Sequence, residues 1–525
     1  MTELALTGSN KLTRRRVTSA AVVGGVTATL VARPTAANAA VTYTPVAYTK
    51  TRLAGSLERL IANRFGYGWT PAMGNEIALA GGWKLWFERQ LGGLLVDDTF
   101  YTTSSKWWPS INASVAQIFD WHVSDQHKLW DSMQDYKRWV LVRRIYSKRQ
   151  VLESMTDFWE NHFHVPAIGE AEAMFRSAYG KGIRQRALGT FEELLKFTTT
   201  HPAMGVYLNN ATSKKSAPNE DLGRELLELH TLGRGNYTET DVVNSARILT
   251  GYHVDVWDTW VASYATTYHW TGPVKVVDFT DANSSPDGRA TTMRYLTYLA
   301  HHPATAHRIA RKLAVRFVSD TPSQALVEQL ASVYLANGTA IKPVLRALVA
   351  SSEFQGSSGR KVRTPDEDVV ATYRALRVKI TAPTAEKSAA NEILWQTHSL
   401  GTQPLVWPRP DGRPDNAEAW TSTSRMLGSF KIHFTMAGSW FPLKDVGYAT
   451  PGSWLPQSTI RFDYLVDHLA RKMTGRRSTS TLLRACCQAV DVAPTEKITR
   501  DHQLVTWKMP RLLTTLLDHP AHMTR

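Results

Sequence analysis

Apolar residues recur three or four positions apart along most of the chain, which is the spacing of helices that bury one face. Glycine, proline and small polar residues separate the periodic segments. The pattern predicts helices over residues 53–65, 83–94, 126–146, 150–162, 190–200, 219–233, 238–251, 291–300, 302–317, 323–336, 339–351 and 365–379, with two more closing the chain. The sequence therefore predicts an all-α fold, a large multi-helical body.

Two stretches depart from this period. Residues 253–290 are aromatic and rich in glycine and aspartate, and the β-prone run from Val274 to Phe279 predicts a short β-hairpin within a loop insertion. Residues 401–420 contain four prolines and predict a long surface loop, a feature that is often functional. We expect a main helical domain over residues 50–355 and a C-terminal helical region over 361–525 that packs on it.

The first 39 residues are typical of a twin-arginine signal peptide. Thr13-Arg14-Arg15-Arg16-Val17-Thr18 is followed by an uncharged apolar run, Ala20–Ala32, and by the cleavage-site pattern Ala37-Asn38-Ala39. The apolar run is too short to anchor the chain in a membrane, since spanning takes about 20 apolar residues. A general secretory signal with an accidental arginine triplet is the alternative. Either signal predicts export from the bacterial cytoplasm, to the cell-wall side or beyond.

Composition narrows the possible partners. The formal charge is +15, and no later stretch has the apolar length of a transmembrane anchor. No groove-entering motif accompanies the charge, so we expect no nucleic-acid ligand; outside the cytoplasm a basic surface suits cell-wall polyanions or acidic glycans. The two cysteines, Cys486 and Cys487, are adjacent and cannot form a disulfide framework.

Two predicted helices each direct an ionisable side chain towards the core. His162 falls within the apolar stripe of residues 150–162, whereas Glu153, Asp157 and Glu160 fall on the opposite side. Glu225 lies at the edge of the apolar stripe of residues 219–233. Because burying either group alone is costly, we expect His162 and Glu225 to lie within reach of one another. Such a pair could be a general acid/base, part of a metal site or a structural hydrogen-bond network.

The remaining candidates carry weaker signals. His269 lies in the irregular segment Tyr268–Lys275 and could be a base, a ligand or a surface residue. His162 and His164 could share a metal ion only if the helix ended between them, and the sequence specifies neither a metal nor a cofactor. The further binding candidates are Arg224 and His230, on the same predicted helix as Glu225, and Trp407 and Trp420, whose indoles could stack on sugar rings.

Several motifs resemble one bacterial family. They are Phe158-Trp159-Glu160-Asn161-His162-Phe163, residues 219–233 (NEDLGRELLELHTLG), residues 237–243 (YTETDVV) and residues 246–251 (ARILTG). Over most of the chain from about residue 50, the sequence resembles the exported domain-of-unknown-function family DUF1800. The resemblance implies a mostly helical exported protein without an established reaction. It also implies a sulfatase-like exported partner protein, which is often encoded beside members of this family. Where the family usually has His-Asp, this chain has His269-Trp270.

Two functional hypotheses remain. The chain lacks the HExxH, GxSxG, P-loop and GxGxxG motifs of common hydrolases and nucleotide-binding proteins. This favours a cell-envelope accessory or binding protein that acts with a partner enzyme or a glycan. The alternative is an exported hydrolase-like enzyme that uses His162, Glu225 and His269, with or without a metal.

Overall fold

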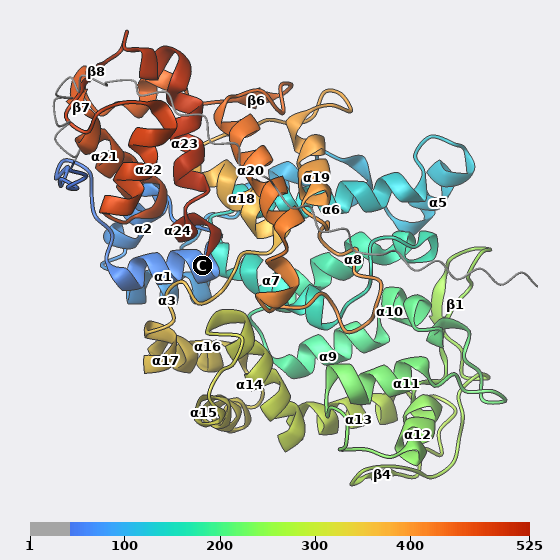
Figure 1. Ribbon diagram of the computed structural model, residues 1–525. Helices are drawn as coiled ribbons and strands as arrows, with labels where there is room; N and C mark the ends of the chain where they lie inside the picture. Colours follow the sequence, from blue (N-terminus) through green and yellow to red (C-terminus); the bar gives the residue numbers. More distant parts are fainter. Residues whose placement is uncertain (1–41) are drawn as a thin grey trace, which may run out of the picture. The chain divides into compact units, whose positions relative to one another are not determined.

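The computed structural model describes residues 42–525, and Figure 1 shows that helices dominate them. The predicted all-α class is confirmed, because the described residues form 24 α-helices and only two-stranded sheets. The predicted signal peptide, residues 1–39, lies outside the described residues.

The helices that precede the first strand are α1 (Ser56–Phe65), α2 (Pro71–Leu79), α3 (Trp83–Gly92), α4 (Thr99–Ser104), α5 (Val115–Val123), α6 (Leu129–Tyr146), α7 (Gln150–His162), α8 (Glu170–Arg186), α9 (Phe191–Thr200), α10 (Pro202–Tyr207), α11 (Asp221–Glu225) and α12 (Glu239–Leu249). The later helices are α13 (Arg289–His301), α14 (Pro303–Phe317), α15 (Gln324–Ala336), α16 (Ile341–Ala350), α17 (Ser352–Gln355), α18 (Pro365–Ala375), α19 (Ala389–Ser399), α20 (Thr423–Ala437), α21 (Phe462–Thr474), α22 (Ser480–Val490), α23 (Met509–Leu517) and α24 (Pro520–Met523).

The strands of residues 42–525 form four antiparallel pairs. Within residues 253–290 the structure has two hairpins where one was predicted: β1 (Tyr252–Val254) pairs with β2 (Ala262–Tyr264), and β3 (Val274–Val276) pairs with β4 (Phe279–Asp281). The other two pairs join distant segments. They are β5 (Lys379–Ile380) with β6 (Val446–Gly447), and β7 (Thr459–Arg461) with β8 (Lys497–Thr499).

Helix α7 is buried on all sides, which corrects the expectation that its acidic residues face away from the core. Glu153, Asp157 and Glu160 are each at most 4% exposed. Arginines from neighbouring helices pair with them: Arg184 with Glu153 at 2.8 Å, Arg144 and Arg316 with Asp157 at 2.5 and 2.9 Å, and Arg176 with Glu160 at 2.9 Å. Close pairing offsets the cost of burying these carboxylates, and helical periodicity alone does not reveal such partners.

The predicted helix over residues 219–233 is shorter and irregular. Helix α11 ends at Glu225, and one π-helical turn, η3 (Leu226–His230), continues it. The segment ends at Gly233, whose φ of +85° lies in the left-handed region that favours glycine. Isolated π-helical turns occur frequently at functional sites.

The C-terminal region contains more helices than the two predicted to close the chain. Helices α19 and α20 flank the proline-rich stretch, and α21–α24 follow. Cys486 and Cys487 are buried and free on α22. Helix α18 packs against α6, so residues 361–525 contact the region before them.

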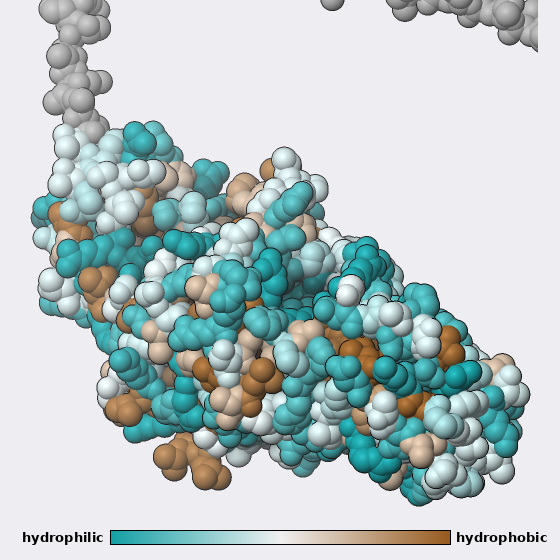
Figure 2. Space-filling model, turned by 90° about the horizontal axis from the view of Figure 1, so that it is seen from below, coloured by the Kyte–Doolittle hydropathy of each residue, from teal (hydrophilic) through white to brown (hydrophobic). Residues whose placement is uncertain are grey.

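The predicted loop over residues 401–420 has no regular structure except a short 3-10 turn, Glu418–Trp420. On the face seen in Figure 2, hydrophilic side chains cover most of the surface, and hydrophobic ones lie in small separate groups. None of the helices among residues 42–525 is long and apolar enough to cross a membrane.

Candidate functional site

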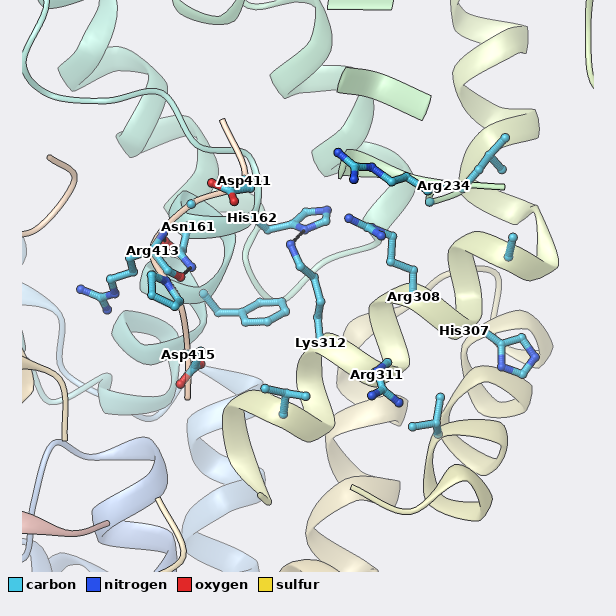
Figure 3. A pocket seen from close by; sticks show the side chains of 18 of the residues that line it. Asn161, His162, Arg234, His307, Arg308, Arg311, Lys312, Asp411, Arg413 and Asp415 are labelled. Atoms are coloured by element: carbon cyan, nitrogen blue, oxygen red, sulfur yellow. Dashed lines mark hydrogen bonds between the residues drawn. The ribbon is translucent and has the colours of Figure 1, made fainter. Parts of the chain in front are cut away.

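A pocket of about 760 Å³ lies where α7 ends, between α14 and the 401–420 loop (Figure 3). Its wall is mainly basic. Six arginine and lysine residues line it, against two aspartates: Arg234, Arg308, Arg311, Lys312, Arg409 and Arg413, with Asp411 and Asp415. His162, His307 and Asn161 add polar groups, and Phe158 and Val327 add apolar surface. A concave wall that combines apolar surface with converging polar groups is typical of a ligand site.

Helix α14 supplies the largest share of the positive charge. Its residues 304, 307, 308, 311, 312 and 315 all line the pocket, and this spacing of three and four positions marks one face of a helix. Figure 3 shows Arg308, Arg311 and Lys312 projecting from this face. The opposite face of α14 is apolar and buried, including Ile309 and Leu313, so packing fixes the direction of the basic stripe.

Three basic side chains of this stripe lack a carboxylate partner. Among the described residues, no aspartate or glutamate lies within salt-bridge distance of Arg308, Arg311 or Lys312, whereas Arg234 pairs with Glu228 at 2.6 Å and Arg409 with Asp411 at 3.2 Å. Arg308 donates instead to the backbone oxygen of Leu229 at 2.9 Å. Positive charge on this wall is therefore left for an anion to neutralise.

His162 is 2% exposed and is held by two contacts. Its Nε2 lies 3.1 Å from the backbone oxygen of His230, and its Nδ1 lies 2.9 Å from Nζ of Lys312 (Figure 3). Because a carbonyl oxygen only accepts, Nε2 carries the proton and Nδ1 accepts from the lysine. Burial and then the charge of Lys312 hold the pKa of His162 well below 6.5, so the ring is neutral.

Lys312 is half-buried, and burial and then the positive charge of Arg308 lower its pKa to about 7. Its one hydrogen bond among the described residues is to His162. A lysine amine that is desolvated beside other cations loses its proton near neutral pH and becomes a base or a nucleophile.

The π-helical turn orients His162 and Arg308. A helix end leaves backbone oxygens without helical partners, and here those of Leu229 and His230 accept from Arg308 and His162. The segment that ends in His230, Thr231, Leu232 and Gly233 thus positions a histidine of α7 and an arginine of α14 at one pocket.

The 401–420 loop is fastened to the end of α7. Asn161 donates from Nδ2 to the backbone oxygen of Arg413 at 3.0 Å. Its Oδ1 accepts from the backbone N–H of Arg413 at 2.8 Å. His164 Nε2 donates to the backbone oxygen of Trp407 at 2.7 Å. His162 and His164 therefore turn to different partners, and neither contact requires a shared ion.

Glu225 is half-buried and does not line the pocket. Among the described residues it forms no hydrogen bond or ion pair, so no direct bond joins it to His162. Burial and then the charge of Glu228 raise its pKa. Arg224 pairs with Glu239 at 2.6 Å and links α11 to α12.

The other sequence candidates lie outside the pocket lining. His269 is 1% exposed, with Nδ1 2.9 Å from the backbone oxygen of Thr250 and Nε2 3.0 Å from Oδ1 of Asn283, contacts that hold the hairpin region together. His230 is buried behind His162, with ring centroids 6.1 Å apart, and within residues 42–525 its two ring nitrogens have no hydrogen-bond partner. Burial and then Lys312 lower its pKa to about 3.

The two tryptophans contribute to the shape of the loop. Trp420 is buried and donates from its indole nitrogen to the backbone oxygen of Pro414 at 2.9 Å. Trp407 is half-buried, and the guanidinium of Arg409 lies 5.6 Å from its ring centroid. Neither indole lines the pocket, so both support the loop that does.

One buried cluster has a composition that could hold a metal ion. The ligand atoms of Asp368, His433 and His522 lie within 4.8 Å of one another. His433 already lies between Asp368 (3.2 Å) and Asp518 (2.7 Å), and Arg425 donates to Asp368. The polar groups of this cluster are therefore satisfied as an ion-pair network.

The sequence reasoning missed Asn161, Arg308, Arg311, Lys312 and Asp411 as site residues. Arginine or lysine at positions 308, 311 and 312 was the available signal, because these positions share a helical face that contains no acidic residue. The contributions of Asn161 and Asp411 depend on the course of an irregular loop.

Comparison with protein families agrees with the motifs. The model described as "Protein of unknown function (DUF1800)" matches residues 60–524. The chain belongs to this family. The DUF1800 match includes every segment that lines the pocket, from α7 to the 401–420 loop. Comparisons with curated proteins and with solved structures gave no match.

Proposed function

We propose that this DUF1800 protein is exported and binds an acidic glycan of the cell envelope through the basic pocket. The observation that carries the proposal is the stripe of Arg308, Arg311 and Lys312 on α14, three basic side chains without a carboxylate partner among the described residues. Arginine forms bidentate hydrogen bonds with carboxylate, sulfate and phosphate groups, and such charge-assisted bonds are about twice as strong as neutral ones.

The pocket suits part of a larger molecule. Its volume of about 760 Å³ is within the range of roughly 300–1,000 Å³ typical of ligand sites. Apolar residues such as Phe158 and Val327 can contact sugar carbons while the basic groups bind the acidic substituents. In this proposal the protein acts as an accessory, presenting the glycan to a partner enzyme such as the sulfatase-like protein that the family resemblance implies.

Calorimetric titration with matched oligosaccharides tests the proposal. An oligogalacturonate should bind and a neutral oligosaccharide of the same length should not, because only the first can neutralise the stripe. Binding of the acidic oligomer should weaken steadily as salt is added, since salt screens exposed charges. Equal binding of the two oligomers, or no binding of either at low salt, would refute it.

A further inference from the structure

The pocket contains an amine whose surroundings differ from those of an ordinary anion-binding lysine. Such a lysine is usually a hydrated ammonium ion that acts as a point charge. Lys312 instead directs Nζ at the neutral ring nitrogen of His162 at 2.9 Å, with no carboxylate at salt-bridge distance among the described residues. Arg308, one helical turn earlier, adds positive charge that disfavours a second cation.

We propose that Lys312 is a nucleophilic lysine that forms an imine with an acidic carbonyl compound, the class represented by 2-oxo acids. The ligand would be a free 2-oxo acid or the open-chain end of an acidic sugar that carries this group. The inference rests on the proposed function, because the same pocket must first bind the acid. It adds a covalent step at one named atom.

The side chains around Lys312 are placed to bind the carboxylate of the ligand and to transfer protons. Arg308 and Arg311 lie on the same face of α14 as Lys312, so a carboxylate bound by them would place its neighbouring carbonyl near the amine. His162 is aligned for proton transfer, because its Nε2–H is occupied by the backbone oxygen of His230 and its Nδ1 lone pair points at Nζ.

The step balances without a redox partner. The amine lone pair attacks the carbonyl carbon, a C–N bond forms, and the first amine proton passes through His162 Nδ1 to the former carbonyl oxygen, which gives a neutral carbinolamine. His162 Nδ1 accepts a proton from the nitrogen and returns it to the hydroxyl group. That group then leaves as water while the C=N bond forms. One water molecule is released for each imine.

Reductive trapping tests this inference on the full chain. The protein is incubated at neutral pH with pyruvate and cyanoborohydride, and labelled lysines are located by peptide mass mapping. Lys472 is the internal control, because it is half-buried like Lys312 and burial lowers its pKa to about 8, but its Nζ lies 5.4 Å from the ring centroid of Trp454 instead of donating to a histidine. Lys312 should be labelled at least about tenfold faster than Lys472.

Two further labelling experiments test the roles of the arginines and of His162. Acetone lacks the carboxylate and should label Lys312 at least about tenfold more slowly than pyruvate, because it cannot use the arginines. His162→Gln should slow labelling of Lys312 about tenfold or more while thermal unfolding remains cooperative. The labelling is then repeated with an acidic sugar that has a 2-oxo acid end in place of pyruvate. The compound that labels Lys312 faster is the preferred ligand.

The outcomes are distinct from those of the proposed function. Labelling of Lys312 no faster than that of Lys472, or equal labelling by acetone and pyruvate, would overturn the inference. If oligogalacturonate still binds in that case, the proposed function survives alone. Selective labelling of Lys312 without glycan binding would support the imine and reject the glycan.

Discussion

At the residue scale, the site depends on polar groups whose partners come from distant parts of the chain. A backbone oxygen that lies 68 residues later in the sequence orients the ring of His162, and the lysine that contacts this ring lies 150 residues later. Sequence periodicity identified His162 as an inward-facing polar residue. It could not identify Lys312 as its neighbour, because no local pattern encodes which helices meet.

His433 gives a residue-scale prediction about stability. Burial alone would lower its pKa, but the charge of Asp368 and the hydrogen bonds to Asp368 and Asp518 raise it to about 9. The pKa of His433 in the folded protein exceeds its unfolded value of about 6.5, so protonation of His433 stabilises the fold. This contribution to the free energy of unfolding is complete below about pH 6.5 and is lost as the pH rises through 9. The contribution amounts to about 3 kcal/mol.

Denaturant unfolding of the wild type and of His433→Gln checks this prediction. The difference in unfolding free energy should be largest at about pH 6 and should shrink by about 3 kcal/mol by about pH 10. Comparing the two proteins cancels the titration of other groups, such as Lys312. A difference that does not change with pH would show that His433 is not an imidazolium between two carboxylates.

At the element scale, the irregular pieces form the site and the regular helices hold them. Helices α7 and α14 were predicted within one or two residues of their observed bounds, because their apolar faces are long and clear. The π-helical turn and the course of the 401–420 loop were not predictable. Their conformations depend on hydrogen bonds from Asn161, His164 and Arg308 that arrive from other elements.

Asn161 provides the element-scale prediction. Asn161→Ala removes both bonds to the backbone of Arg413, at a cost of about 1–3 kcal/mol in unfolding free energy, and should free the loop. Limited proteolysis should then cut within residues 401–420 faster than in the wild type. Asn416→Ala is the matched control, since in the described part of the chain the side chain of exposed Asn416 accepts one local hydrogen bond, from the backbone N–H of Ala419. Equal cleavage of both variants would show that Asn161 does not hold the loop.

At the scale of the whole molecule, the fold class and the helical organisation were readable from the sequence, whereas the buried charge network was not. Asp157 pairs with Arg144, Arg316 and Arg413, which come from three separate segments. Amphipathic analysis places acidic residues on the outside by default. It therefore misassigns a central helix whose acids are neutralised by arginines from elsewhere.

Export is the prediction that concerns the whole chain. Replacing Arg14 and Arg15 by lysine should retain the protein in the cytoplasm, because the twin-arginine route recognises the guanidinium pair itself. Cell fractionation with immunodetection measures the result. Normal secretion of the double-lysine variant would indicate the general secretory route instead.

The central claim, that the stripe on α14 binds an acidic ligand, is tested most directly by the dissociation constant of oligogalacturonate for two charge-matched variants. Arg311→Gln removes an exposed arginine from the pocket, and Arg511→Gln removes an exposed arginine from α23, outside the lining. Arg311→Gln should weaken binding about tenfold, or 1.4 kcal/mol, while Arg511→Gln leaves it unchanged. Equal affinities of the two variants would contradict the account.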